Sequence, residues 1–375
     1  MFKGRHKEKN VMEIEIRLKK ILREHGLDHH GVTQRIARDL EVHRHTIGRL
    51  YRNQMANPSL KVLGDLCDWL EARGVPAEKL PKELLGSRPR GLWRAVAAGG
   101  VVRIYLGEYQ QMQREAPVML WISRRDATVQ DGIVRVLSTP STVGEVRPTV
   151  MVEYVPFRFV SLGSYVKRQF EEDLARSKDV FDKMRSKERR ASSILIGSQR
   201  VNYLVELFVA DLFGCKPFQP IRKGIKVPFY LTYHSRDRAV PSCFGGLRPP
   251  PGKKGTLDPG IHHLDKNGKW VYCPWTSRKE DAGVIIEVYD PGTERVELAV
   301  FGFSGWGTEA LGRQLLRDPK PFWPPYYTWK CKQLGIYVCR FGMEATVLPD
   351  AGEVIHANDL KIERIDGRIL QRYLP

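Results

Sequence analysis

The sequence predicts an α+β protein of more than one domain, with a small all-helical domain at the N-terminus and a larger α/β domain after it. Apolar residues recur at helical spacing through residues 13–73, and from residue 101 onward short β-branched runs alternate with helical stretches. A chain of 375 residues is long enough to bury a core in each part. The expected parts are a flexible basic arm at 1–12, the helical domain at 13–73, a linker rich in Pro and Gly at 74–100, and the α/β domain at 101–375.

The N-terminal domain is predicted to contain five short helices, the first of them over residues 13–25. A later helix has Ile36, Ala37 and Leu40 on one apolar face, and a tight turn at Glu41 follows it. The last helix of this domain is expected to have an apolar face made of Leu60, Leu63, Leu66, Cys67 and Leu70, with Asn57 or Ser59 as its N-cap.

The helix between these two carries side chains that suit the major groove of DNA. Ile47 and Leu50 mark its buried side, so Arg44, His45 and Arg49 are expected on the outer side. Arginine is suited to bidentate contact with guanine, and these three residues are the candidates for base contacts. The candidates for phosphate contacts, which position a helix without reading sequence, are His43, Thr46, Arg52, Asn53 and Lys61.

The run I-A-x-x-L-x-V-x-x-x-T-I-x-x-L from Ile36 to Leu50, followed by N-P-S-L at residues 57–60, resembles the lambda-repressor-like (Cro or XRE-type) helix-turn-helix family. The resemblance is confined to residues 16–70 and implies a domain that binds double-stranded DNA. The sequence departs from the family pattern twice. Glu41 stands where a glycine commonly closes the turn, and His43 stands where a serine or threonine usually caps the recognition helix.

The larger domain is predicted to be an α/β domain with a mostly parallel sheet, because its candidate strands are interleaved with candidate helices. The strands are Val101–Leu106, Val118–Ile122, Thr149–Val155, Ser193–Ile196, Val227–Thr232, Gly283–Tyr289, Glu297–Phe301 and Gly335–Phe341. The helices are 163–189, 201–213 and 308–316, and the first of these is expected to cover the sheet or pair with a second copy. Residues 234–282 are rich in Pro, Gly and charge, and they are expected to form a long functional loop or an insertion.

Two segments of this domain share one design, in which an apolar strand leads through a turn rich in Gly and Ser into a helix. Glycines allow close approach of a ligand, and helix N-termini offer free N–H groups to an anion. An anionic, nucleotide-like effector between the two turns is therefore expected, and the alternative is that both are merely tight turns. The candidate residues are Gly197, Ser198, Arg200 and Asn202 in the first turn and Ser304, Gly305, Gly307 and Thr308 in the second.

The second turn reads G-x-S-G-x-G-T from Gly302 to Thr308, and it is similar to the glycine-rich turn of Rossmann-like nucleotide-binding proteins related to lysine decarboxylase-like phosphoribohydrolases. The resemblance implies a Rossmann-like fold and nucleotide binding. That family has a glutamate three positions after the threonine, and Leu311 stands there in this chain while Glu309 directly follows Thr308. The catalytic acid of the family is therefore not carried over.

Composition and motif content narrow the function classes further. The net charge of +18 points to polyanionic partners. The first ten residues lack the apolar core of a signal peptide, and no apolar run is long enough to span a membrane, so a cytoplasmic protein is expected. The six cysteines lack C-x-x-C spacing and are expected to be reduced, and His262, His263 and Cys273 lack a fourth metal ligand, so no metal or cofactor is expected.

The function expected from the sequence is that of a sequence-specific DNA-binding transcriptional regulator, a homodimer whose C-terminal domain senses a ligand or mediates self-association. One alternative is an enzyme that acts on a nucleotide or nucleoside and is targeted by its DNA-binding domain. Another is an interaction protein of a defence or antitoxin-like system. No nucleophile elbow, Walker loop or HExxH motif is present, so no catalytic residue is predicted. Asp281 and Asp290 flank one strand, and they are interpreted as solvated loop carboxylates or helix caps, with membership of a site at the sheet edge as the alternative.

Overall fold

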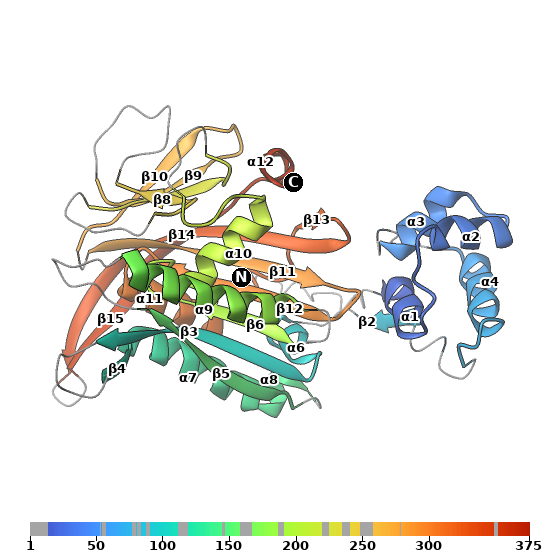
Figure 1. The fold of residues 1–375 in the computed structure, drawn as a ribbon, viewed down its shortest axis with the longest axis horizontal. Coiled ribbons are helices and arrows are strands. Elements are labelled where there is room, and N and C mark those ends of the chain that lie inside the picture. Colours follow the sequence, from blue (N-terminus) through green and yellow to red (C-terminus); the bar gives the residue numbers. More distant parts are fainter. Residues whose placement is uncertain are drawn as a thin grey trace, which may run out of the picture. The chain divides into compact units, whose positions relative to one another are not determined.

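The chain folds into two compact units, which are formed by Met1–Arg90 with Asp290–Glu294 and by Gly91–Tyr289 with Arg295–Pro375 (Figure 1). The larger unit thus begins at Gly91, inside the segment 74–100 that the sequence analysis treats as a linker. The computed structural model describes residues 14–52, 54, 58–76, 80, 84–87, 91–111, 119–144, 147–157, 167–186, 191–219, 225–234, 241–247, 258–277, 279–348 and 352–375.

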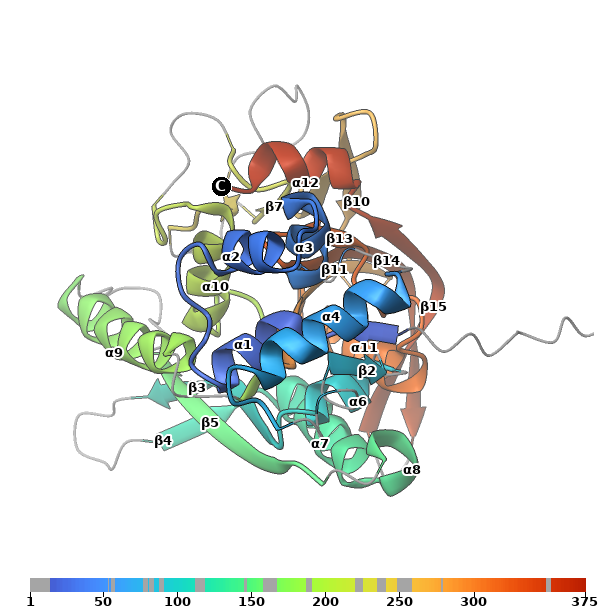
Figure 2. The same ribbon diagram turned by 90° about the vertical axis from the view of Figure 1, so that its right-hand side faces the viewer.

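The smaller unit is built mainly from short helices (Figure 2). Its elements are β1 (Ile14–Ile16), α1 (Leu18–Glu24), α2 (Val32–Asp39), α3 (Arg44–Tyr51), α4 (Leu60–Glu71) and β2 (Leu85–Ser87). Within residues 13–73 the described part of the chain forms the four helices α1–α4, where five were predicted. The core contains the apolar positions expected from helical spacing, among them Ile36, Ile47, Leu50, Leu66 and Leu70, whereas Leu60 is 85% exposed.

The prediction of a helix over residues 13–25 is wrong at its start, because Ile14–Ile16 form strand β1. This strand pairs antiparallel with β2, so that Ile14 lies opposite Ser87, and the N–H of Arg17 donates to the carbonyl of Leu84 at 2.9 Å. The I-E-I sequence alternates apolar and charged residues, which suits a strand as well as the first turn of a helix. Pairing with a segment far along the chain decides between the two.

The turn between α2 and α3 is closed by a residue with left-handed backbone geometry. Glu41 has a φ of 53°. The N–H of Glu41 donates to Arg38 O at 3.2 Å, and the N–H of Val42 donates to Ala37 O at 3.0 Å. These two bonds form a Schellman motif, in which glycine is the usual residue at the left-handed position. Glu41 therefore adopts the backbone geometry that the sequence analysis assigned to a glycine.

The larger unit is a mixed α/β structure. Its strands are β3 (Val101–Gln111), β4 (Met119–Ile122), β5 (Thr149–Phe157), β6 (Ser192–Ile196), β7 (Phe229–Thr232), β8 (Gly245–Gly246), β9 (Gly260–Leu264), β10 (Trp270–Pro274), β11 (Glu280–Asp290), β12 (Arg295–Gly302), β13 (Tyr327–Trp329), β14 (Lys332–Leu348) and β15 (Gly352–Arg364). Its helices are α6 (Leu92–Ala97), α7 (Arg124–Ser138), α8 (Pro140–Val143), α9 (Lys167–Arg185), α10 (Tyr203–Phe213), α11 (Gly305–Arg317) and α12 (Gly367–Tyr373). All eight strands expected from the sequence are confirmed, with shifted ends.

The main sheet is mixed, which corrects the prediction of a mostly parallel sheet. Its strands follow the order β13-β14-β11-β12-β6-β3-β4, with β15 on β14 and β5 on β3. Pairing is parallel between β12 and β6, β6 and β3, and β3 and β5, but antiparallel between β11 and β14 and between β14 and β15. Only residues 349–351 separate β14 from β15, whereas a parallel crossover needs a dozen or more residues.

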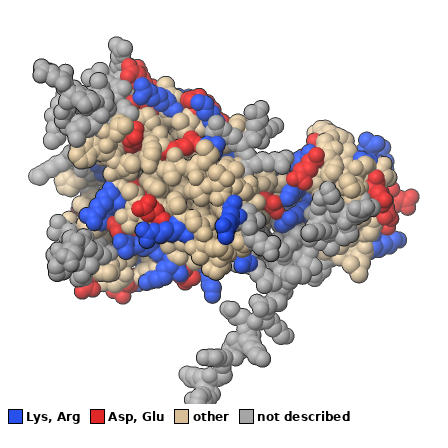
Figure 3. Space-filling view, turned by 90° about the horizontal axis from the view of Figure 1, so that it is seen from below, with Lys and Arg blue, Asp and Glu red and all other residues tan. Residues whose placement is uncertain are grey.

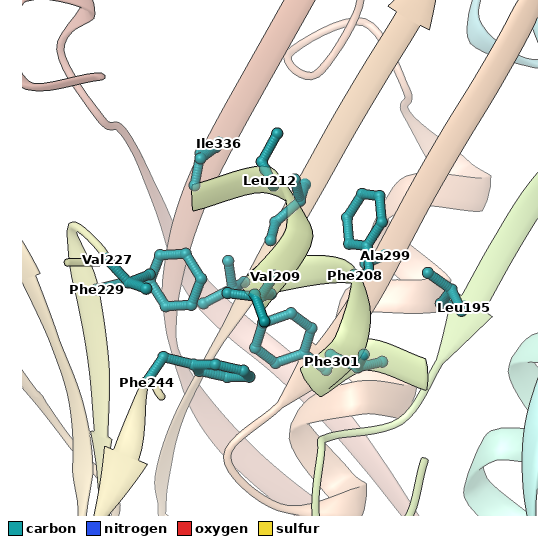
Figure 4. Close-up of a cluster of buried hydrophobic side chains, with 14 of the residues drawn as sticks. Leu195, Phe208, Val209, Leu212, Val227, Phe229, Phe244, Ala299, Phe301 and Ile336 are labelled. Atoms are coloured by element: carbon teal, nitrogen blue, oxygen red, sulfur yellow. The ribbon is translucent and has the colours of Figure 1, made fainter. Parts of the chain in front are cut away.

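Helices and a second sheet cover the two faces of the main sheet. On one face α10 packs with the four-stranded sheet β10-β9-β7-β8 in an aromatic-rich core, where Phe208, Phe229, Phe244 and Phe301 meet (Figure 4). On the other face α6, α7 and α11 bury apolar residues against the sheet. Strand β11 serves both cores by alternation, since Ile286 belongs to the first and Ile285 to the second.

The expectation of a long irregular segment over 234–282 is wrong in part. Strands β9 and β10 form an antiparallel pair there, with His263 opposite Val271, and β9 also pairs with β7. These strands are only five residues long and are bounded by Gly and Pro, so their alternation was hidden by turn residues. Among the helices in the described part of the chain, none combines the length and apolar character that crossing a membrane requires.

Candidate functional site

A shallow hollow of about 200 Å³ opens on the surface of the smaller unit where α2 and α3 meet. Two residues near the start of α2 and four residues along α3 line it, namely Thr33, Gln34, Arg44, His45, Gly48 and Arg52. Arg44, Gly48 and Arg52 are four residues apart and therefore lie on one stripe of α3. Within the described part of the chain this lining contains two arginines and no carboxylate, so it suits an anionic or hydrogen-bonding surface.

Packing fixes which side of α3 faces outward. Ile47 and Leu50 are fully buried, while Arg44 and His45 are exposed. Asp39 of α2 links this helix to α4, because it accepts from the indole Nε1 of Trp69 at 2.8 Å and from Arg73, which follows α4, at 2.9 Å. The arrangement of α2, α3 and α4 thus presents one stripe of α3 to solvent, as the apolar spacing predicted.

The first turn of α3 is capped by a histidine. The Nδ1 atom of His43 accepts a hydrogen bond from the N–H of His45 at 3.3 Å, and the two imidazole rings stack with centroids 5.0 Å apart. His43 thus replaces the serine or threonine that the family pattern has at this position. Both rings are held at the N-terminal end of α3, beside Arg44.

The structure separates Arg49 from the hollow. Its guanidinium Nη2 donates to the carbonyl oxygen of Gln54 at 3.1 Å, beyond the C-terminal end of α3. Arg52 donates from Nε to the side-chain oxygen of the same Gln54 at 2.8 Å, yet it still lines the hollow. Arg44, His45 and Arg52 are therefore brought together, and Arg49 is placed at the end of the helix.

The remaining candidates for phosphate contacts are distributed around this surface. Thr46 is half-buried, and Lys61 is exposed in the first turn of α4, where Ser59 caps the helix by accepting from Val62 N–H at 3.2 Å. Asn53 lies outside the described residues. The sequence analysis missed Thr33 and Gln34. The signal that could have found them is Gly31, which directly precedes the first turn of α2 and is the left-handed N-cap of that helix.

The two predicted ligand turns of the larger unit lie at the same edge of the main sheet. They follow the adjacent parallel strands β6 and β12, in which Ile196 lies opposite Val300. The N–H of Gly197 donates to the carbonyl of Val300 at 3.1 Å. We refer to this edge, where β6 and β12 end beside Leu106 of β3, as the carboxyl edge. In open α/β sheets ligands bind at such an edge.

Several candidate residues of these turns are engaged within the protein. The amide of Asn202 donates to Tyr105 O and to Ile196 O, each at 3.0 Å, and so ties β3 to β6. The hydroxyl of Thr308 accepts from Gly302 N–H at 2.9 Å. Asn202 and Thr308 therefore stabilise the turns themselves.

The second turn packs against a buried aspartate. Ser304 caps α11 by accepting from Gly307 N–H at 3.3 Å, and its hydroxyl donates to Asp281. A Cβ atom on Gly307 would lie 2.7 Å from Oδ2 of Asp281, so this glycine is required by packing against the protein. Asp281 is fully buried, and burial raises its pKa to about 7. The sequence analysis interpreted Asp281 as a loop carboxylate, which is wrong.

The first turn lies beside two buried polar side chains that the sequence analysis did not select. Asp126, in the first turn of α7, is 3% exposed, and its Oδ2 atom lies 3.1 Å from the place a Cβ of Gly197 would take. Burial raises the pKa of Asp126 to about 7. Gln199 is also 3% exposed; its Nε2 donates to the hydroxyl of Tyr233, and its Oε1 has no hydrogen-bond partner among the described residues.

The other polar residues of the second turn are held by ion pairs and close packing. Glu309 accepts from Arg125 at 2.5 Å and from Arg313 at 2.7 Å, and Arg125 also lies over the ring of Trp306. A Cβ on Gly305 would contact only Arg125, at 3.7 Å. In the first turn, Ser198 is 8% exposed, and its carbonyl accepts from Asn202 N–H at 2.8 Å.

The chain shows no similarity that assigns a function. Comparisons with protein-family models, with curated proteins and with solved structures find no match. Among the described residues no group of three or more His, Cys, Asp or Glu side chains is placed to hold a metal ion. The ring of His262 packs against that of Tyr272, with centroids 4.8 Å apart and the planes tilted by 31°. The α2–α3 hollow and the carboxyl edge are therefore the two surfaces from which a function is inferred.

Proposed function

We propose that this protein is a sequence-specific DNA-binding transcriptional regulator whose larger unit senses a ligand or mediates self-association. The observation that carries the proposal is the hollow between α2 and α3, which holds Arg44, His45 and Arg52 on a helix whose opposite side is buried. A helix with one buried apolar side and one exposed basic side fits the major groove of DNA, and arginine pairs with guanine there.

The residues of this surface have different roles in the proposal. Arg44 and His45 contact base edges from the N-terminal part of α3, and Arg49 contacts DNA from its last turn. Thr33 and Gln34, at the start of α2, donate hydrogen bonds to the phosphate backbone of the DNA. The phosphate contacts, which fix the orientation of α3 on the duplex, are made by His43, Thr46, Arg52, Asn53 and Lys61.

Self-association completes the proposal. A helical unit of this size contacts one half-site, and two copies related by two-fold symmetry read a palindromic operator. We therefore propose a homodimer that acts in the cytoplasm. Counterion release by its basic residues makes binding weaker as salt rises.

The test is a selection of operator DNA from a random pool by the full chain, followed by affinity measurements on variants. We expect Arg44→Ala to lose about 1–3 kcal/mol on the selected operator and to relax base preference locally. Arg44→Lys keeps the charge but not the bidentate fork, so it should lose specificity while retaining non-specific binding. Lys61→Ala should weaken binding to all DNA sequences alike.

Two results would contradict this proposal. One is a selection that enriches no sequence. The other is an Arg44→Ala variant that binds the enriched operator as tightly as the parent, because α3 would then not be the reading helix. Circular dichroism of each variant, compared with the parent, checks that the helices are intact.

A further inference from the structure

We propose that the carboxyl edge binds a nucleoside monophosphate, with Gln199 and Asp126 contacting the base and Arg200 contacting the phosphate. The inference rests on the proposed function, since it names the ligand class that the larger unit senses. It is independent of how the smaller unit reads DNA.

The first observation is a buried acceptor without a partner. Gln199 is 3% exposed, and its amide nitrogen already donates to Tyr233, while Oε1 has no partner among the described residues. A buried polar atom is nearly always satisfied, and one that is not marks a functional group or an absent ligand atom. The position of Gln199 directly after β6, at the edge where ligands of parallel sheets bind, favours the second explanation.

The second observation is that Gln199 belongs to a connected group. The guanidinium of Arg200 lies 5.0 Å from the ring centroid of Tyr233, which Gln199 contacts. Burial raises the pKa of Tyr109. The charge of Arg200 lowers this pKa and the charge of Asp126 raises it, so both side chains lie near the phenol of Tyr109. An amide, a carboxyl group, a guanidinium and two phenols thus come together from β3, α7, the turn after β6 and the end of β7.

The chemistry of this group defines a ligand with three features. The Gln199 oxygen accepts hydrogen bonds, and the Asp126 carboxyl keeps an accepting oxygen whether or not it is protonated, so both pair with N–H donors on the ligand. Arg200 supplies a planar cation that pairs with phosphate. Tyr109 is half-buried, and its ring offers an aromatic face on which a flat ring stacks, whereas the ring of Tyr233 already stacks on Phe303 with centroids 5.8 Å apart. A nucleoside monophosphate combines N–H donors, a flat aromatic ring and an anion in one molecule.

The glycines around this group keep space for it. A Cβ on Gly245 would lie 2.9 Å from Nε2 of Gln199 and 3.0 Å from the ring of Tyr233, and a Cβ on Gly197 would approach Asp126. Gly197 also has a φ of 94°, which other residues rarely adopt. Both positions therefore need glycine, because a Cβ there would displace Gln199 or Asp126 from the position that the proposed contacts to a base require.

The experiment is isothermal titration calorimetry of the full chain with GMP, AMP, CMP and UMP. We expect at least one of them to bind with a Kd below about 1 mM, the weak end of specific affinities. Gln199→Leu should raise the Kd of that nucleotide about tenfold or more. Gln333→Leu is the matched control, because Gln333 of β14 is also buried and its Oε1 has no hydrogen-bond partner within the described part of the chain, but it lies opposite Tyr289, at the other end of β11 from Asp281.

Arg200→Ala tests the phosphate contact and provides a second variant should Gln199→Leu fail to fold. This variant should weaken binding of the monophosphate more than binding of the corresponding nucleoside. Absence of binding by all four nucleotides, equal affinity of Gln199→Leu and the parent, or an equal loss in Gln333→Leu would overturn the inference. Operator binding without nucleotide is measured on the same samples, so failure here is distinguishable from failure of the DNA-binding proposal.

Discussion

Asp126 and Asp281 show how a residue type that is common on surfaces acquires a different role through burial. Both lie at the carboxyl edge, are at most 3% exposed and have a pKa raised by burial to about 7. A sequence pattern does not reveal this, because the same aspartates on exposed loops would have ordinary pKa values. Their burial depends on the two turns, because Gly197 of the first lies against Asp126 and Gly307 of the second lies against Asp281, each from a distant part of the chain.

Stability should therefore depend on pH through Asp126. Its folded-state pKa of about 7 exceeds the ordinary value of 3.8, so the folded protein holds this proton after the unfolded chain has released it. The contribution is fully present below about pH 4 and is lost as pH rises towards 7. In Asp126→Asn the fall in the free energy of unfolding between pH 4 and 7 should shrink by on the order of 3 kcal/mol.

Urea denaturation at several pH values measures this change. Asp131→Asn is the matched control, because Asp131 is an exposed residue of the same helix α7 and its replacement should leave the pH dependence unaltered. Identical pH profiles for Asp126→Asn and the parent would show that the carboxyl of Asp126 is not protonated in the folded protein at neutral pH.

At the scale of elements, local sequence patterns were most informative where one helix or strand buries one face. The spacing of Ile36, Ala37, Ile47 and Leu50 predicted the inward sides of α2 and α3, and all four are buried. The helices expected at 201–213 and 308–316 are present as α10 and α11. In contrast, Ile14–Ile16 were assigned to a helix, because a three-residue alternation contains too little periodicity to exclude a strand.

The turn between α2 and α3 yields a test at this scale. Glu41 has left-handed backbone geometry, which is unfavourable for a residue with a Cβ atom. Glu41→Gly should therefore stabilise the smaller unit by about 0.5–1 kcal/mol. Glu71→Gly, at the exposed last position of α4, should destabilise it by a similar amount, because glycine is a poor helix former.

Hydrogen exchange of the α2 and α3 amides reports the stability of this unit separately from the larger one. Faster exchange in Glu41→Gly than in the parent would mean that the Schellman motif does not close this turn. The comparison with Glu71→Gly separates the effect of the backbone conformation from the effect of losing a glutamate.

At the scale of the whole molecule, the sequence predicted the strands better than their directions. Each expected strand lies in a sheet, but within the described main sheet the parallel arrangement holds for β12, β6, β3 and β5 alone. Short connections such as 291–294 indicate the direction of a strand, because a few residues can join antiparallel strands in a hairpin but cannot form the crossover that parallel strands need. The two ligand turns were expected to be neighbours and are, whereas Asp126, Gln199 and Tyr233 come together only through the tertiary fold.

Net charge gives little guidance to the position of a binding surface. The chain carries a net charge of +18, yet on the face of the larger unit seen in Figure 3 the Lys and Arg side chains are interspersed with Asp and Glu. Such a mixed surface produces a weaker field than a cluster of one sign. The hollow between α2 and α3, with two arginines in its lining and no carboxylate among the residues described there, is a more specific indication.

DNA binding through this hollow is most directly tested by introducing a carboxylate into it. Gly48 lines the hollow, and a Cβ there would contact only the guanidinium of Arg52, at 3.5 Å, so Gly48→Glu should fold. Gly64 of α4 is the matched control, because it is exposed, helical and has nothing within 4 Å of an added Cβ. Both variants change the charge equally.

The affinity of the full chain for its selected operator is the measurement. We predict that Gly48→Glu weakens binding by about 100-fold or more, since the new carboxylate faces the phosphates and bases and pairs with Arg52, which is then lost to the DNA, whereas Gly64→Glu changes affinity by less than about fivefold. Equal affinities of the two variants for the operator would contradict the assignment of the α2–α3 surface as the part of this protein that reads DNA.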